Sequence, residues 1–494
     1  MSTVPIVTSL EDVYTQVEKQ KPRYDTIASH FNSEYNLQPQ YYARAPGRVN
    51  LIGEHIDYSG YGVLPMALEK DVIIASVLLP RMVNLCSNTL PKEYTTKVVS
   101  VTINNNPSSA FDNLNIDPKA HHWTNYVLCG VKGVLQHIKN LNDTSFKSSD
   151  LSGKTLDLYL LLDGDVPSGS GLSSSSAVVC ASSLTTSHAL GYSKEITKEQ
   201  FGSLTAKSEQ FVGVQSGGMD QAISFLGQRN QAMYIQFEPT LSASPVSLPE
   251  DVSFVVSHTM VSSLKSQTAA KNYNRRVVEC RLACVLLHKA LTQEPLLEGP
   301  RTLKWLQEKL NSTFEDMIAA CEKHLSKEPY SMQQIAESIG LKDSDELQSR
   351  FFPSVDLHDK SNLKLQDRSI HVFSESYRVI QVEELCNKNK GDNKSEKIGQ
   401  LMNESHYSGR DLYEASCPEL EQLTTLCRST KGCLGSRFTG AGWGGCAVSC
   451  VKKENLNEFL DTVWEQYYAK EHGGSKRENV LFASQPSAGA AIIE

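Results

Sequence analysis

The segment that most constrains the fold is a short apolar run followed at once by a turn rich in glycine and serine. Residues 156–163 read Leu-Asp-Leu-Tyr-Leu-Leu-Leu-Asp, which is typical of a buried strand. Residues 163–177 read Asp-Gly-Asp-Val-Pro-Ser-Gly-Ser-Gly-Leu-Ser-Ser-Ser-Ser-Ala, and a helix is predicted from about Ser174 to Leu190. Glycines let a backbone approach an anion closely, and free N–H groups at a helix start point at it. The segment therefore predicts a phosphate-binding loop.

An ordinary serine-rich turn with a helix cap is the alternative for this segment. The order of its residues favours phosphate binding, because a proline precedes the spaced glycines and serines and an apolar helix follows them. The segment lacks the Gly-Lys-Ser/Thr ending of a Walker P-loop, so it does not belong to that class.

The size and charge of the chain restrict what it can bind. Its 494 residues exceed what one hydrophobic core normally serves, so we expect two domains with a site in the cleft between them. A content of 40% hydrophobic and 21% charged residues is that of a folded globular protein. The formal net charge of −8 offers no basic surface for nucleic acid or an anionic membrane. We expect neither as the main partner.

The cysteines and the first residues of the chain indicate in which cellular compartment the protein is expected. The twelve cysteines, from Cys86 to Cys450, lack metal-knuckle spacing and are interpreted as free thiols in a reducing compartment. The first residues lack the basic and apolar regions of a secretory signal, and no apolar run approaches membrane-spanning length. We expect a cytoplasmic monomer, although no residue pattern bears on the oligomeric state.

Three other segments have readable secondary structure. Residues 40–90 are predicted to form strand, turn and strand. Charged and apolar residues interleave at helical spacing over 272–291, which predicts an amphipathic helix. Glycine and small or β-branched residues at 434–451 predict a hairpin with close backbone contacts. Polar residues predict exposed loops at 104–115, 294–300 and 387–397.

The phosphate loop resembles that of the GHMP small-molecule kinases, named for galactokinase, homoserine, mevalonate and phosphomevalonate kinases. Residues 44–58, Arg-Ala-Pro-Gly-Arg-Val-Asn-Leu-Ile-Gly-Glu-His-Ile-Asp-Tyr, look like the galactokinase signature. Residues 217–221, Gly-Gly-Met-Asp-Gln, are similar to the family's catalytic segment, and 435–446 are similar to its third motif. Further likenesses at 401–406 and 413–420 extend the resemblance over almost the whole chain.

Resemblance to the galactokinase family implies an α+β fold of two domains, residues 1–245 and 246–494, with the active site in the cleft between them. It also implies ATP and Mg²⁺ as cofactors. Similarity at 277–283 leans towards the eukaryotic branch, which contains both galactokinases and N-acetylgalactosamine kinases.

Polar side chains at 54–57 suit a sugar ligand. Glu54, His55 and Asp57 supply several hydrogen-bond acceptors within four positions, as recognition of a ring of hydroxyls requires. Any one of them alone reads as a surface turn residue, whereas three beside Arg48 favour a site. The resemblance assigns sugar contacts to these three and to Arg48, Gly217, Asp220 and Tyr273.

Phosphoryl transfer needs a positioned acceptor oxygen and cations near the phosphoryl group. The resemblance gives Arg48 the role of such a cation and gives Asp220 the role of accepting the proton of the anomeric hydroxyl. An aspartate beside an arginine stays ionised and is a weak base, but a late proton transfer needs little basicity. The alternative for Asp220 is a helix cap.

The resemblance also assigns the nucleotide site. The phosphate loop is expected to contribute Gly169, Ser170, Gly171, Leu172, Ser173, Ser174, Ser175 and Ser176. Mg²⁺ binds through few protein oxygens, and Ser175 and Glu209 match the family's magnesium contacts. A solvated helix glutamate is the alternative for Glu209. Trp123 and Tyr126 match aromatics placed beside the adenine, although aromatics three residues apart also simply pack together.

The resemblance implies phosphorylation of the C1 hydroxyl of galactose by ATP. The alternatives are an N-acetylgalactosamine kinase and a non-catalytic regulator that binds galactose and ATP. Tyr273 favours galactose, because galactokinases typically carry tyrosine at the matching position, whereas the N-acetylgalactosamine kinases that this chain resembles carry phenylalanine. The full phosphate loop, with Arg48 and Asp220, favours catalysis. The Glu-His-Ile-Asp block at 54–57 disfavours mevalonate or homoserine as the substrate.

Overall fold

The computed structural model gives the placement of most of the chain. It describes residues 2–80, 97–103, 110–112, 114–117, 122–141, 147, 156–263, 272–355, 357, 360–387, 393–469 and 476–494. Cys86, most of the predicted loop at 104–115 and part of that at 387–397 lie outside the described residues.

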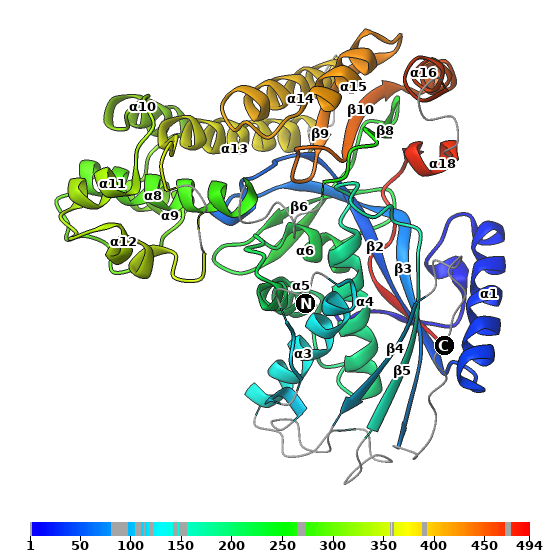
Figure 1. Cartoon of the computed structure of the whole chain (residues 1–494). Coiled ribbons are helices and arrows are strands. Elements are labelled where there is room, and N and C mark those ends of the chain that lie inside the picture. The colour runs from blue at the N-terminus through cyan, green and yellow to red at the C-terminus, as the bar shows by residue number, and fades with distance from the viewer. Residues whose placement is uncertain are drawn as a thin grey trace.

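In the described residues, six strands form one sheet in the order β1-β12-β2-β3-β5-β4. Their bounds are β1 Ile6–Val7, β2 Tyr41–Ile52, β3 Leu64–Pro80, β4 Lys97–Ile103, β5 Leu156–Gly164 and β12 Ala491–Ile493. Neighbouring strands are antiparallel except β1 and β12, which are parallel. Helix α1 (Val17–Tyr35) covers one face of this sheet, and α3 (Thr124–Asn140) and α4 (Ser174–Ala189) cover the other (Figure 1).

A second, antiparallel sheet has the order β11-β8-β10-β9. Its strands are β8 Val252–His258, β9 Cys433–Thr439, β10 Cys446–Lys452 and β11 Leu481–Ser484. The helices around it are α8 Asn274–Leu291, α9 Leu303–Leu310, α10 Phe314–His324, α11 Met332–Ile339, α12 Ser344–Phe351, α13 Leu365–Asn387, α14 Lys394–Asp411, α15 Pro418–Ser429, α16 Leu456–Val463 and α18 Arg477–Val480. Figure 1 shows α8 to α12 extending away from the sheet.

Shorter elements connect the two sheets. They are α5 Lys198–Ser208, η4 Glu209–Val212, α6 Met219–Leu226 and the hairpin of β6 Ala232–Gln236 with β7 Ser242–Val246. The turn between β2 and β3 contains a 3-10 helix, η2 Asp57–Ser59. These elements place the segment 41–64 next to the segment 216–226.

Most of the local sequence predictions are confirmed where the structure describes them. The apolar run at 156–163 is β5, the segment after the glycine turn is α4, and residues 433–452 form the β9–β10 hairpin. The segment at 272–291 contains the predicted helix, α8, but the helix is buried on most of its surface, because Arg276 and Glu279 pair with each other in the interior. The predicted exposed loop at 387–397 is wrong at its end, where Lys394–Lys397 begin α14 and Ser395 is buried. The mixed α+β fold is therefore the expected one.

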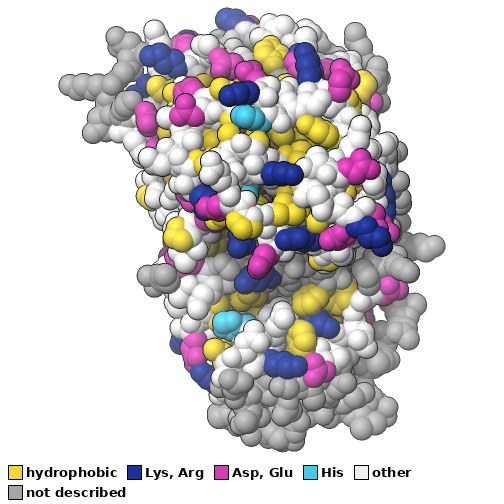
Figure 2. Space-filling view, turned by 90° about the vertical axis from the view of Figure 1, so that its left-hand side faces the viewer, with side chains coloured by type: hydrophobic (Ala, Val, Ile, Leu, Met, Phe, Trp, Pro, Cys, Tyr) yellow, Lys and Arg dark blue, Asp and Glu magenta, His cyan; other side chains and the backbone are white. Residues whose placement is uncertain are grey.

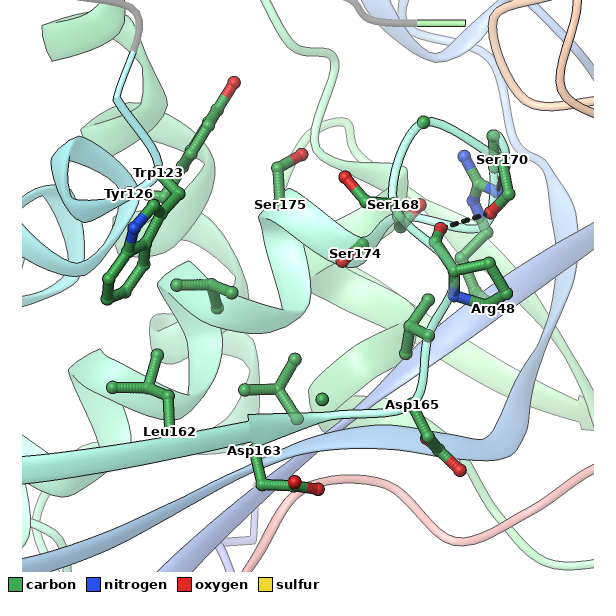
Figure 3. A pocket seen from close by; sticks show the side chains of 18 of the residues that line it. Arg48, Trp123, Tyr126, Leu162, Asp163, Asp165, Ser168, Ser170, Ser174 and Ser175 are labelled. Atoms are coloured by element: carbon green, nitrogen blue, oxygen red, sulfur yellow. Dashed lines mark hydrogen bonds between the residues drawn. The ribbon is translucent and has the colours of Figure 1, made fainter. Parts of the chain in front are cut away.

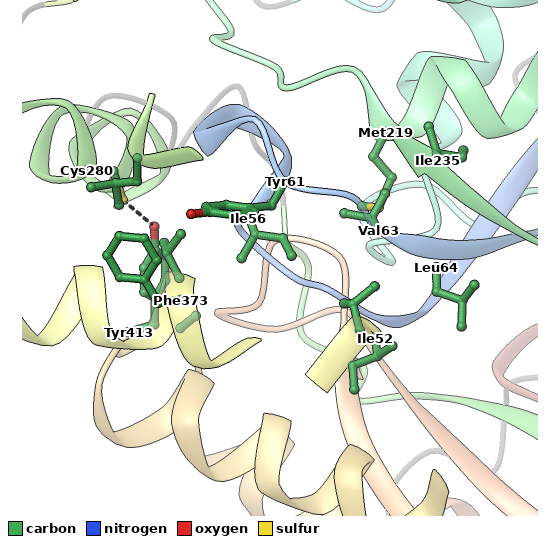
Figure 4. Packing of buried hydrophobic residues seen from close by; sticks show 14 of the residues in the cluster. Ile52, Ile56, Tyr61, Val63, Leu64, Met219, Ile235, Cys280, Phe373 and Tyr413 are labelled. Atoms are coloured by element: carbon green, nitrogen blue, oxygen red, sulfur yellow. Dashed lines mark hydrogen bonds between the residues drawn. The ribbon is translucent and has the colours of Figure 1, made fainter. Parts of the chain in front are cut away.

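One large buried cluster joins the two halves of the molecule. Figure 4 shows Ile52, Ile56 and Val63 from the β2–β3 turn packing towards α6 on one side and Phe373 of α13 on the other. The return of β12 to the first sheet adds a second connection, because it follows all the elements of the second sheet in the chain. The two halves thus share a core, and the first sheet is completed by a distant segment of the sequence.

The face of the molecule drawn in Figure 2 carries a mixture of acidic and basic side chains, as expected from a net charge of −8. On the face drawn in Figure 2, Lys and Arg side chains alternate with Asp and Glu side chains among the residues shown in colour. Among the described residues, no helix combines the length and the apolar character needed to cross a bilayer.

Replacing Ile492 by alanine is expected to lower the free energy of unfolding by about 2–5 kcal/mol, because the change removes fully buried apolar atoms from the sheet core. Chemical denaturation measures the change. Leu141→Ala, at a side chain that is 48% exposed, is the control and should alter the free energy by less than about 0.5 kcal/mol. Equal losses in the two variants would contradict the placement of β12 in the core.

Candidate active site

The phosphate loop between β5 and α4 has the backbone of an anion site. Gly169, Gly171 and Ser173 all have positive φ, and Ser173 is the residue that precedes the first turn of α4. The Ser173 side chain does not cap the helix, and its buried Oγ has no hydrogen-bond partner among the described residues. The Ser170 hydroxyl instead braces the loop by donating to the Pro167 carbonyl at 2.6 Å (Figure 3). An unpartnered hydroxyl and a free helix N-terminus fit a phosphate group.

A cavity of about 730 Å³ opens against this loop. Figure 3 shows Trp123 and Tyr126 on one side of it and Ser168, Ser174 and Ser175 on the other. Trp123 also packs against the buried core of the first sheet. Its position therefore agrees both with a role in packing and with the predicted place beside the adenine. An aromatic wall opposite an anion-binding loop has the layout that a nucleoside triphosphate requires.

Two of the predicted loop residues do not line this cavity. The Leu172 side chain is buried in the core, and its carbonyl accepts a hydrogen bond from the Arg48 amide at 3.1 Å. The Ser176 hydroxyl is also buried and donates to Glu209 Oε1 at 2.7 Å. Both residues support the loop from behind.

A second, much smaller cavity collects the predicted sugar residues except Gly217, which does not line it. It is lined by Arg48, Glu54, His55, Asp57, Ser216, Met219, Asp220, Tyr273, Gly440 and Ala441. Its side chains come from both halves of the chain, since Gly440 and Ala441 follow β9 and Tyr273 immediately precedes α8. Arg48 lines both cavities, so the two sites meet at its side chain.

Arg48 and Asp220 form a buried ion pair. The Arg48 side chain is 2% exposed and that of Asp220 is 4% exposed, with Nε and Nη2 of the arginine each 2.8 Å from Asp220 Oδ1. The third nitrogen, Nη1, donates to the Gly171 carbonyl at 2.5 Å and so ties the pair to the phosphate loop. Asp220 is the second residue of α6, and Gly218 occupies the cap position, so Asp220 is not the cap. The positive end of the helix stabilises its carboxylate.

His55 is held in one orientation by hydrogen bonds on both ring nitrogens. Its Nε2 lies 2.8 Å from the Ala441 carbonyl, which can only accept, so Nε2 carries the proton. In a neutral ring Nδ1 then accepts from the Tyr58 hydroxyl at 3.0 Å. Tyr58 in turn accepts from the Tyr413 hydroxyl at 2.6 Å. This chain of hydrogen bonds fixes the tautomer that His55 presents to the cavity.

Glu54 is buried at the base of the small cavity. Its Oε1 accepts a hydrogen bond of 2.7 Å from the Gly440 amide and one of 3.4 Å from Arg437. Burial raises the pKa of Glu54 above its ordinary value, and the charges of Arg437 and Arg48 oppose this effect. Burial, together with the charges of Asp57 and Asp220, also raises the pKa of Tyr273 well above its ordinary value, so its hydroxyl stays protonated.

Gly217 is required by the shape of the small cavity. A Cβ atom at this position would lie 2.3 Å from Asp57 Cγ, which is closer than real Cβ contacts allow. Asp57 Oδ2 also accepts a long hydrogen bond of 3.4 Å from the Met219 amide. The absent side chain therefore lets Asp57 lie beside the start of α6.

The two predicted magnesium residues differ in exposure. Ser175 is half-buried and lines the large cavity, whereas Glu209 is 2% exposed and contacts Ser176. Glu209 is therefore not the solvated helix residue of the alternative interpretation. In the described part of the chain, no group of three or more His, Cys, Asp and Glu side chains could hold a metal ion. Mg²⁺ that is carried by a triphosphate needs few protein ligands, so Ser175 and Glu209 are enough to fit this ion.

The β9–β10 turn lies directly against the phosphate loop, as the glycines of the hairpin prediction require. A Cβ atom on Gly440 would lie 2.5 Å from the Gly171 carbonyl oxygen, and one on Gly445 would lie 2.7 Å from that of Ser170. Both glycines have positive φ. The turn therefore positions the phosphate loop by backbone contact.

Sequence reasoning missed several cavity residues. In the small cavity these are Ser216, Met219, Gly440 and Ala441, and in the large cavity they include Ser263 and Asn479. The first four are adjacent to predicted residues or lie in the motif at 435–446, and this proximity was a usable signal. Ser263, whose amide donates to the Gly169 carbonyl at 2.7 Å, and Asn479 had none.

A phosphate loop at a helix start, joined by one arginine to a small polar cavity, defines a small-molecule kinase of the GHMP class. The family models agree: GHMP kinases N terminal domain matches residues 125–228, and GHMP kinases C terminal matches residues 382–470. A galactokinase galactose-binding signature matches residues 29–76. The chain belongs to the galactokinase family.

Similar proteins extend over the whole chain. Dictyostelium discoideum galactokinase is 41% identical over 99% of this chain and 97% of its own length. Saccharomyces cerevisiae galactokinase is 34% identical, with 95% and 94% covered. The structure of Lactococcus lactis galactokinase complexed with galactose has the same fold, with a TM-score of 0.65 at 22% identity and 95% and 99% coverage. The chain is therefore an ATP-dependent sugar kinase.

Gly440→Ala is expected to lower kcat/KM by roughly a hundredfold, because the added Cβ displaces the phosphate loop. Steady-state kinetics with varied ATP measures the effect, and thermal unfolding checks the fold.

Gly340→Ala is the matched control for Gly440→Ala. Gly340 also has positive φ, at +79° against +82°, but nothing lies within 4 Å of its Cβ position. Gly340→Ala should lower the free energy of unfolding but leave kcat/KM unchanged. Similar kinetic losses in the two variants would show that backbone strain, not contact with the loop, is responsible.

Proposed function

We propose that the chain transfers the γ-phosphoryl group of ATP to the anomeric C1 hydroxyl of galactose. The observation that carries this proposal is the position of Arg48, whose guanidinium lines both cavities and contacts both the phosphate loop and Asp220. A sugar in the small cavity would have its nearest hydroxyl at the junction with the large one.

The nucleotide is proposed to bind in the large cavity. Its adenine would lie against Trp123 and Tyr126, and its phosphates would lie against the backbone of residues 169–175. The Ser173 hydroxyl, which lacks a partner among the described residues, is available to a phosphate oxygen. The N-terminus of α4 adds the partial positive charge that an anion prefers.

Mg²⁺ is proposed to be held by Ser175 and by Glu209. The Ser175 hydroxyl would contact the ion directly, and Glu209 would contact it directly or orient its ligands from beneath the loop, where it already holds Ser176. When bound, the ion neutralises charge on the phosphate oxygens.

Arg48 and Asp220 are the proposed catalytic residues. Phosphoryl transfer proceeds through a loose transition state, so the main tasks are to align the acceptor oxygen and to neutralise charge. Asp220 would accept the proton of the C1 hydroxyl, and Arg48 keeps that carboxylate ionised while its charge faces the phosphoryl group. The proton moves to the carboxylate as the new oxygen–phosphorus bond forms and the bond to the leaving ADP breaks.

Sugar recognition is assigned to the walls of the small cavity. Glu54 and Asp57 supply acceptors for hydroxyls, and His55 is fixed by the chain through Tyr58. Gly217 keeps the wall next to Asp57 free of a side chain. The buried Tyr273 closes the cavity and favours galactose over N-acetylgalactosamine, which carries a larger group at C2.

We also propose a division of the chain at residue 245, with residues 491–493 returning to the first sheet. The proposed setting is cytoplasmic, with the protein as a monomer. The free thiols of the described cysteines are consistent with a reducing compartment.

Asp220→Asn is expected to lower kcat by roughly 10²- to 10⁴-fold while galactose binding changes little, because the amide keeps the shape but cannot accept the proton. Turnover is measured on a panel that includes galactose and N-acetylgalactosamine, and sugar binding is measured by calorimetry. Asp71→Asn, which alters the buried pair with Arg44 outside the small cavity, is the control. If the asparagine variant turned over galactose at the wild-type rate, Asp220 would not be the general base. If the wild type preferred N-acetylgalactosamine, the assignment of galactose as the substrate would be wrong.

Glu209→Gln is expected to raise the Mg²⁺ concentration for half-maximal activity by roughly ten- to a hundredfold, because it removes a charge that holds or orients metal ligands. Magnesium titrations at fixed ATP measure this, and chelation should abolish turnover in both proteins. Glu195→Gln, at an exposed position, is the control. An unchanged magnesium requirement would exclude Glu209 from the metal site.

A further inference from the structure

Arg437 is a fully buried arginine directly behind the small cavity. It lies on β9, and its side chain is 0% exposed. Its Nη1 is 3.4 Å from Glu54 Oε1 and equally far from the carbonyl oxygens of Asn50 and Leu51. The contacts bind β9 to the end of β2, where the sugar-binding turn begins.

A second buried carboxylate also lies near this cation. Glu375 of α13 has an oxygen 3.9 Å from Arg437 Nη2, and it accepts hydrogen bonds from the Gly53 amide and from Ser405. Burial alone would raise the pKa of Glu375, but Arg378 and Arg437 lower it to about 2, so it is ionised. Arg437 therefore directs Nη1 to Glu54 and Nη2 to Glu375, and the contact with Glu375 helps to fix its side chain.

The hydrogen bonds to the Glu54 carboxylate come from the end of β9, and the nearby Asn50 side chain also favours its charged form. The Gly440 amide and Arg437 both reach Oε1, and they lie three residues apart at the end of β9. With Oε1 occupied in this way, Oε2 is the oxygen available to a ligand in the cavity that Glu54 lines.

We infer that Arg437 is a positioning residue for the sugar, which holds the Glu54 carboxylate turned so that it accepts a hydrogen bond from a sugar hydroxyl. This inference rests on the proposed galactose site. Arg437 does not line the cavity itself, so it acts through Glu54.

The charged groups around Glu54 determine how acidity affects it. They are Arg48 of β2, Arg437 of β9 and His371 of α13, together with His55, Asp57, Asp220 and Tyr273, which line the same cavity. Glu375 and its partner Arg378, both of α13, face Arg437. Burial lowers the pKa of His371 to about 4, so this ring is neutral near pH 7. Burial raises the pKa of Glu54, and loss of the Arg437 charge would raise it further. Protonated Glu54 would then persist to higher pH.

The test compares Arg437→Met with the wild type, after the wild type has been shown to phosphorylate galactose. We expect the KM for galactose to rise roughly ten- to a hundredfold, since a charged hydrogen-bond partner is lost, while the KM for ATP stays within about twofold. The acid limb of kcat/KM for galactose should move to higher pH. A purely structural role would raise both KM values and leave the acid limb in place, and this result would overturn the inference.

Arg44→Met is the matched control. Arg44 is also 0% exposed, pairs with the carboxylate of Asp71 at 2.6 Å and donates to backbone carbonyls, but it lines neither cavity. This variant should lose stability without a change in the acid limb. A wild type that did not phosphorylate galactose would refute the proposed function instead.

A second comparison decides the matter if Arg437→Met does not fold. Arg437→Lys keeps the positive charge but cannot make all the contacts of the longer, branched guanidinium. The effect of this substitution on galactose affinity is measured by calorimetry, both in the wild-type background and in the Glu54→Gln background. We expect a weaker affinity only where Glu54 is present. An equal effect in both backgrounds would overturn the role of Arg437.

Discussion

The structure depends on the buried guanidinium of Arg48. One planar group satisfies the Asp220 carboxylate and the Gly171 carbonyl at the same time, while the backbone amide of the same residue donates to Leu172. Because water does not screen these contacts, removing one partner would leave a charge without compensation. The end of β2, the phosphate loop and the start of α6 are therefore fixed relative to one another, and the distance between the two cavities is fixed with them.

Contacts between backbones complete this arrangement. The turn after β9 touches the phosphate loop through glycines, the loop touches residue 263, and Glu54 accepts from the same turn. Such contacts leave no room for side chains to adjust, so the chemistry of both ligands is positioned by main-chain geometry. The proposed catalytic groups, Arg48 and Asp220, are few, and most of the surrounding residues hold them in place.

The sequence predicted those features that depend on local pattern. An apolar run, a glycine turn and a helix at 156–190 follow from strand and helix periodicity and from the conformational demands of glycine, and the polar set at 54–57 follows from its chemistry. Contacts between distant residues had no such signal. Nothing near Tyr413 in the chain indicates that it supports His55 through Tyr58, and Arg437 lies 383 positions from Glu54. Asn479 lies in α18, immediately before β11 of the second sheet, and lines the large cavity through tertiary packing alone.

The position of β12 has a consequence for how the protein is made on the ribosome. This strand lies between β1 and β2, although it is synthesised after every other element. Until it emerges, β2 presents an open edge of unpaired amides and carbonyls, and such edges invite pairing with other chains. The nascent protein thus carries an incomplete first sheet through nearly all of its synthesis, and this edge needs protection from other chains until β12 is made.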